Sequence, residues 1–149
     1  MPRTTVLAIT ALAVLSHAAS AKEPAKKPES VRKIAVAVDP LAAANLQRKP
    51  GVTVASAEKE MKKAFGEEIA KQITGNVDFA KEDVVHVAWG SSGPPFGKLA
   101  RETKDGKDGK IITFFVKVPK TVVQGQAYRL GNDFFAAPKT AKVKFGGAR

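Results

Sequence analysis

The spacing of apolar residues predicts one helix in the first half of the chain. In SAEKEMKKAFGEEIAKQITGN, apolar side chains return at every fourth position: Met61, Phe65, Ile69 and Ile73. That period matches one face of an α-helix. We therefore expect one amphipathic helix over 57–74, with Ser56 as its N-cap, Gly66 inside it and Gly75-Asn76 as its stop.

Beyond residue 75 the period changes from about four to two, which is the period of a β-strand. This pattern runs through DVVHVAW at 83–89 and KIITFFVKVP at 110–119, and VRKIAVAVDP at 31–40 shows it before the helix. Two shorter strands are expected around Phe134-Phe135 and over Lys142 to Phe145. This order predicts an α+β fold: a mainly antiparallel β sheet or small sandwich with one amphipathic helix packed on it.

The N-terminus has the pattern of a secretory signal peptide. Arg3 precedes an apolar run from Val6 to Leu15, which is too short to span a bilayer, and Ala19-Ser20-Ala21 is a small-x-small cleavage site. We expect cleavage after Ala21, a disordered spacer over 22–30 and a single globular domain over 31–149. The expected location is secreted or periplasmic, with no transmembrane segment after signal cleavage.

Charge is distributed unevenly along the chain. Residues 98–149 hold 12 basic and 4 acidic residues, a formal charge of +8, whereas residues 22–97 amount to +2. An excess of this size is typical of proteins that meet an anionic partner, and also of a solvated, soluble surface. The sequence leaves open whether the basic residues share one face.

The Gly- and Pro-rich stretch GSSGPPFGK at 90–98 does not fit either catalytic loop that it suggests. A phosphate-binding loop would need glycine in place of Ser92 and a hydroxyl residue in place of Leu99. A nucleophile elbow would need glycines two residues on either side of the serine. We expect a rigid connection between strands that presents binding residues to a partner. The candidate binding residues are Trp89, Ser91, Ser92, Phe96, Lys98 and Arg101.

Other signatures of catalysis and metal binding are also missing. The chain has no cysteine, and His86 is the one histidine left after signal cleavage, so a histidine-based metal site lacks ligands. The run KDGKDGK has the spacing of a hairpin turn instead of a calcium loop. We expect no catalytic residue, metal or cofactor, although a hydrolase with two carboxylates that meet in space stays open.

The second half of the chain resembles known exported proteins. The run from Gly75 to Lys120, with its DFAKEDVV opening and WGSSG turn, and the later YRLGNDFFAAPKTAKVKF resemble a family of small exported bacterial proteins without assigned function. More distantly, the chain is similar to the C-terminal domain of PrcB-type protease-complex subunits. Their turn has a glycine pair followed by an aromatic residue, whereas this chain has Gly93-Pro94-Pro95-Phe96. The resemblance spans about residues 75–145 and implies a β-rich accessory module that contacts other proteins.

Together these observations predict a basic, exported, non-enzymatic binding module that acts by protein–protein contact. The first alternative is an electrostatic binder of an anionic envelope polymer or of lipid head groups at a membrane surface. The second is a hydrolase that uses paired carboxylates. We expect a protein partner and no nucleic acid.

Overall fold

The computed structural model describes residues 30–39, 46, 49–93, 95–120 and 128–149 of the chain. The expected signal peptide and spacer, apart from Ser30, lie outside the described residues. The described elements, in chain order, are β1 (Arg32–Ile34), β2 (Gly51–Ala55), α2 (Glu58–Phe65), α3 (Glu67–Thr74), β3 (Glu82–Ser92), β4 (Lys98–Gly106), β5 (Gly109–Lys117), β6 (Tyr128–Pro138) and β7 (Lys142–Ala148).

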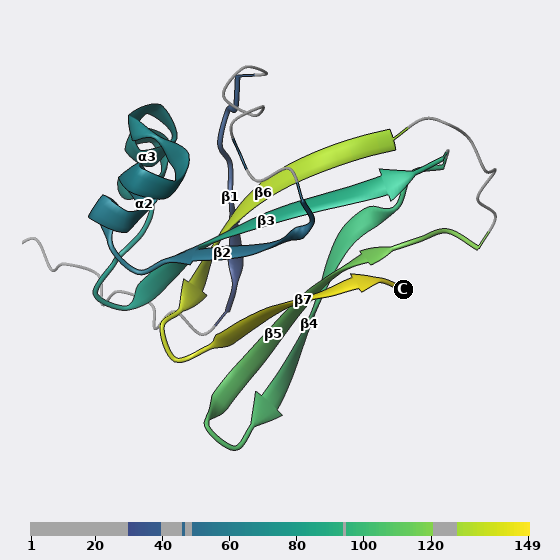
Figure 1. The fold of residues 1–149 in the computed structure, drawn as a ribbon. Helices are drawn as coiled ribbons and strands as arrows, with labels where there is room; N and C mark the ends of the chain where they lie inside the picture. The colour runs from purple at the N-terminus through teal and green to yellow at the C-terminus, as the bar shows by residue number, and fades with distance from the viewer. Residues whose placement is uncertain (1–29, 40–45, 47–48, 94, 121–127) are drawn as a thin grey trace, which may run out of the picture.

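The strands form two sheets that pack face to face, and the helices cover the outer side of the larger one (Figure 1). The four-stranded sheet has the order β1-β6-β3-β2 and is antiparallel throughout. The three-stranded sheet has the order β4-β5-β7, in which β5 and β7 run parallel. The expected α+β class with a small β sandwich is confirmed.

The four-stranded sheet is the middle layer, and both of its faces are buried. Val84 of β3 packs with Met61 and Ile73 from the helices, whereas its neighbour Val85 packs with Phe114 of the other sheet. Alternate residues of β3 therefore enter two different cores. This explains why β3 is apolar at almost every position instead of at every second one.

The helical segment differs from the expectation of one helix over 57–74, because it is broken into α2 and α3 at Gly66. Gly66 has φ 86° and ψ 165°, a conformation that is essentially restricted to glycine. The expected N-cap was also wrong: Ala57 occupies that position, and Ser56 instead donates its backbone N–H to the Glu60 carboxylate at 2.8 Å. No helix among the described residues is long and apolar enough to cross a membrane.

The stretch 90–98 is only partly a turn. Gly90, Ser91 and Ser92 continue β3 and pair with β6, and the connection to β4 begins at Gly93. A side chain at position 90 would collide with the Tyr128 ring, since a Cβ there would lie 1.9 Å from the Tyr128 hydroxyl. The expected hairpin at KDGKDGK is present as the tight turn between β4 and β5.

Candidate functional site

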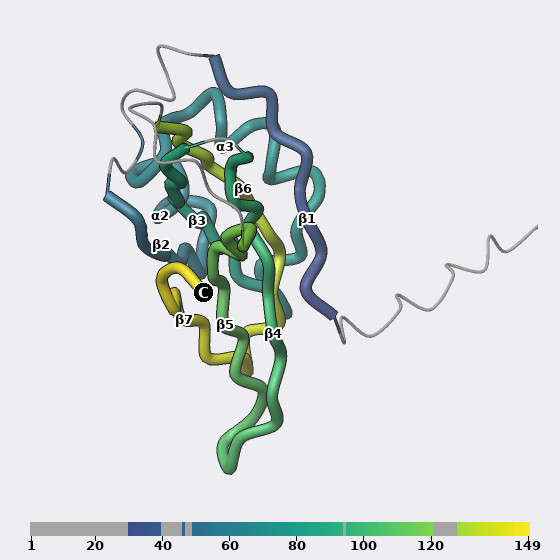
Figure 2. Tube along the Cα trace, turned by 90° about the vertical axis from the view of Figure 1, so that its right-hand side faces the viewer, coloured from purple at the N-terminus to yellow at the C-terminus, as the bar shows by residue number. Residues whose placement is uncertain are grey.

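The sandwich is closed along one side and hollow along the other. β2 lies against β7 on the closed side. On the opposite side, where the edge strands β1 and β4 face each other (Figure 2), two cavities of about 250 Å³ each lie between the sheets. Arg101 of β4 lines both cavities. We call this hollow side the seam, and the first of its cavities, the one that reaches Asp133, the seam cavity.

The register of β4 explains why a cation lines the seam. Arg101 pairs with Phe114, whose side chain is fully buried between the sheets. Residues directly opposite each other in an antiparallel pair project from the same face, so Arg101 projects from the inner face of its sheet. Because β4 is an edge strand, the guanidinium reaches the open side of the sandwich. Leu99, Phe114 and Phe135 supply the apolar wall of the seam cavity.

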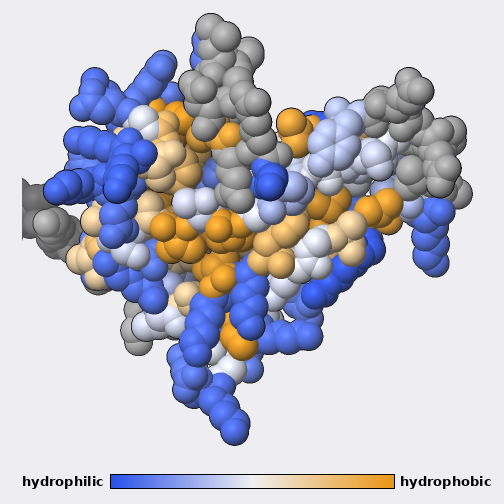
Figure 3. All heavy atoms as spheres, viewed as in Figure 1, coloured by the Kyte–Doolittle hydropathy of each residue, from blue (hydrophilic) through white to orange (hydrophobic). Residues whose placement is uncertain are grey.

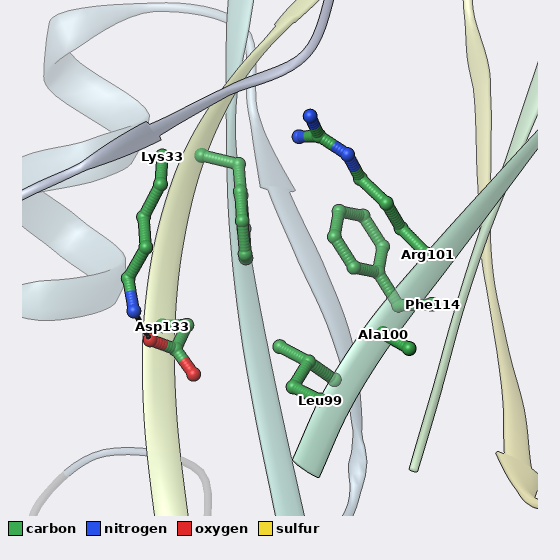
Figure 4. Close-up of a pocket in the computed structure, with 7 residues that line it drawn as sticks. Lys33, Leu99, Ala100, Arg101, Phe114 and Asp133 are labelled. Atoms are coloured by element: carbon green, nitrogen blue, oxygen red, sulfur yellow. Dashed lines mark ion pairs between the residues drawn. The ribbon is translucent and has the colours of Figure 1, made fainter. Parts of the chain in front are cut away.

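A polar cluster holds the opposite wall. Lys33 of β1 and Asp133 of β6 form an ion pair with 2.5 Å between Nζ and Oδ1. The indole N–H of Trp89 donates to the other oxygen, Oδ2, at 2.7 Å. Figure 4 shows the Lys33 side chain directed at Asp133, with Arg101 projecting from β4 across the cavity. Both oxygens of Asp133 are therefore engaged within the protein.

Trp89 is positioned by the glycine opposite it. Gly131 pairs with Trp89 across β3 and β6, and a Cβ at position 131 would lie 2.2 Å from the indole. The indole thus lies close against the Gly131 backbone, where its N–H reaches Asp133. A larger residue at position 131 would displace the indole and break this hydrogen bond.

The charges of the seam cavity do not balance. Asp133 is matched by Lys33, but the Arg101 side chain forms no hydrogen bond or ion pair with any described residue. The seam cavity therefore combines apolar walls with one unmatched positive charge. This combination suits a carboxylate on an apolar stem, because a guanidinium binds carboxylates with two parallel hydrogen bonds.

A wider cleft of about 560 Å³ lies beside the seam, between β6 and the chain that follows β1. Its charged lining residues are Lys33 and Asp133, which are already paired with each other. No unmatched charge lines it among the described residues, so the seam cavity is the stronger candidate for binding.

His86 lies away from the seam, in the core beneath the helices. Its ring packs against Phe65 and Phe134 with centroid distances of 5.1 and 4.8 Å. Nε2 is 2.9 Å from Asn132 Oδ1, and buried Nδ1 has no partner among the described residues. Burial lowers the pKa of His86, although Asn132 and Asp133 partly oppose that shift. Within the described ranges, no group of three or more His, Asp or Glu residues could hold a metal ion.

The structure separates the six residues predicted for binding. Arg101 lines the seam cavity, and Trp89 donates a hydrogen bond to Asp133, which also lines it. Ser91 is buried and accepts a hydrogen bond from the Gly97 N–H at 2.8 Å, so it closes the loop instead of facing a partner. Ser92 and Lys98 are exposed and Phe96 is half-buried, and none of these three lines the seam cavities.

Sequence reasoning missed Lys33 and Asp133. Each is a charged residue at an inward-facing position of a strand, because Lys33 pairs with buried Phe135 and Asp133 pairs with buried Val87. A charge at such a position was the available signal. It could be recognised only once the inward face of β1 and β6 was known.

No family model, curated protein or solved structure matches the chain. The functional argument therefore rests on the geometry of the molecule itself.

Proposed function

We propose that this chain is an exported, non-enzymatic accessory module that binds another protein, and that its seam receives an acidic side chain of that partner. The resemblance to β-rich accessory modules points in the same direction. The seam cavity of about 250 Å³ is smaller than most small-molecule sites, which run from about 300 to 1,000 Å³. It has room for one anchoring side chain of a larger interface.

The observation that carries the proposal is the unmatched Arg101. Arg101 is an exposed residue, but it lies on the inner face of its sheet with Leu99 and Phe114 beside it. A guanidinium binds a carboxylate with two parallel hydrogen bonds, a geometry that a lysine ammonium does not match. Arginines that fill or line pockets at the centre of an interface commonly dominate its binding energy.

The test compares two charge reversals on the same strand. The mature chain, from Lys22, is immobilised as wild type, Arg101→Glu and Lys98→Glu, and the envelope and extracellular fractions of its source are passed over each. Arg101 and Lys98 lie on opposite faces of β4, and both substitutions change the net charge equally. Glutamate also keeps a charge at position 101, which discourages unwanted pairing of the edge strand.

We expect wild type and Lys98→Glu to retain one discrete protein at high salt and Arg101→Glu to lose it. That protein, once purified, should change the fluorescence of Trp89, the single tryptophan. The Trp89 indole donates a hydrogen bond to Asp133, which lines the seam cavity. Equal retention by all three forms, or no change in Trp89 emission, would contradict a role for the seam.

A further inference from the structure

Half of the twelve basic residues of the last third gather on one face of the molecule. The side chains of Ile112, Phe114 and Val116 enter the core between the sheets, so the β5 residues between them project outward. The same register places five lysines on that outer face: Lys98 and Lys104 of β4, Lys117 of β5, and Lys142 and Lys144 of β7. Figure 3 shows hydrophilic residues gathered over the region where β4, β5 and β7 lie.

Arg149 joins these lysines, since its Cζ lies 4.6 Å from the centroid of the Phe115 ring, and Phe115 is an outward residue of β5. We call this group of six cations the basic face. Among the described residues of the β4, β5 and β7 strands, Glu102 is the carboxylate that the register places on this face. Its oxygens lie 3.0 Å from Lys104 Nζ and 3.1 Å from Arg149 Nη1, contacts that lower the pKa of Glu102.

Three lysines of the basic face have no such compensation. The side chains of these three, Lys98, Lys117 and Lys144, form no hydrogen bond or ion pair with any described residue. Lys98 and Lys117 are moreover direct cross-strand partners, which places their Cβ atoms about 4.5–5.5 Å apart. Like charges in that arrangement destabilise a sheet, and an anion bound between them would relieve the repulsion.

We propose that the basic face binds a linear polyanion. The basic face extends from Lys98 to Lys104 along β4, about 20 Å at the rise of an extended strand, with Ala100 and Glu102 between these two lysines on the same face. The six cations are spread over β4, β5, β7 and Arg149, so one extended chain of negative charges contacts several of them at once. This surface is separate from the seam, because Lys98 and Arg101 lie on opposite faces of β4.

A polymer fits the basic face better than a membrane surface does. Stable attachment to a bilayer requires apolar side chains that enter the acyl region as well as positive charge. The apolar residues on this face are Ala100, Ile111 and Phe115, and each is at least partly buried. The Arg149 guanidinium also lies over the Phe115 ring. The face therefore presents charge without protruding apolar groups.

The experiment measures binding of the mature chain to long-chain polyphosphate, tripolyphosphate and vesicles with about one-third anionic lipid. Wild type should bind long-chain polyphosphate more tightly than tripolyphosphate or vesicles. With about three to four lysine contacts, affinity should fall about 20–50-fold between 50 and 200 mM salt. The Lys98→Glu/Lys117→Glu double variant should bind at least about ten-fold more weakly, and its salt slope should drop by about 1.4.

The matched control is Lys59→Glu/Lys71→Glu, which makes the same change in net charge on the exposed surface of α2 and α3. This variant should bind polyphosphate almost as wild type does. An equal loss in both double variants would mean that net charge alone governs binding and would overturn the proposal. Equal affinity for tripolyphosphate and the long chain, or tighter binding to vesicles, would overturn it as well.

Arg101→Glu separates this proposal from the seam. That variant should keep its polyphosphate binding while losing the protein partner, and the double variant of the basic face should do the opposite. Either surface can therefore fail its test without affecting the result for the other.

Discussion

Lowering the pH below neutrality should destabilise the fold through one residue, His86. Its side chain is fully buried, its Nδ1 lacks a partner among the described residues, and Phe65 and Phe134 flank the ring. Burial lowers its pKa below the ordinary value of 6.5. The folded protein therefore keeps His86 neutral at pH values at which the unfolded chain already takes up a proton.

The sign and size of the effect follow from proton linkage. Above pH 6.5 the imidazole is neutral in both states, and the stabilisation of the folded state is complete. As the pH falls below 6.5, the unfolded state gains a proton that the folded state excludes, so the free energy of unfolding drops by up to about 1.4 kcal/mol per pH unit. The loss levels off at the lowered pKa of folded His86. Asp78 and Glu102, whose pKa values are lowered from 3.8 and 4.5, lose their contributions only in more acidic solution.

The assay is urea unfolding of the mature chain between pH 7.5 and 5.0, followed by the fluorescence of Trp89, which is buried in the folded state. His86→Phe is the comparison, because a phenyl ring suits the aromatic surroundings and cannot be protonated. This variant leaves Asn132 without a donor, so its stability at pH 7.5 should be about 1 kcal/mol lower. Its free energy of unfolding should nevertheless stay level between pH 6.5 and 5.0. Parallel pH profiles for the two proteins would refute the account.

Two further substitutions test how the fold positions Trp89 and the loop that follows β3. Gly131→Ala should destabilise the fold by about 1–3 kcal/mol and shift the emission of folded Trp89, since the new methyl group would collide with the indole. Gly75→Ala, at an αR position with open space around it, should stay within about 0.5 kcal/mol of wild type, and an equal cost at both positions would argue against the collision. Ser91→Ala should cost about 1–3 kcal/mol in thermal unfolding and remove hydrogen-exchange protection at the Gly97 amide, because it deletes the acceptor of a buried N–H. Ser92→Ala, at the exposed neighbour, should leave both readouts unchanged.

The helix shows what periodicity alone can predict. Met61, Ile69 and Ile73 all face the core as expected. The break at Gly66 was missed because the apolar stripe continues across it with the same spacing. The apolar stripe predicts which face of the helix is buried. It does not predict a break at a single residue with positive φ, because the spacing of the apolar residues stays the same.

The strands show a second limit. Alternation predicted the segments of β3 and β5, and even the short β7 near Phe145. It could not reveal that β7 runs parallel to β5, since this pairing depends on how the chain returns across the sheet. The seam has the same origin: Lys33, Arg101 and Asp133 come from three strands that are distant in sequence, and only the strand order brings them to one cavity.

The position of the β4–β5 hairpin has a consequence for how the chain folds. The two central strands of the four-stranded sheet, β3 and β6, pair along their whole length, yet the hairpin lies between them in sequence. Hairpins form within microseconds, whereas distant strands must first overcome the entropy of closing a loop. A preformed β4–β5 hairpin shortens the loop between Ser92 and Tyr128 by roughly half, which lowers the cost of closing it by about 0.6 kcal/mol. The hairpin that carries Arg101 and half of the basic face would thus also speed the meeting of β3 and β6.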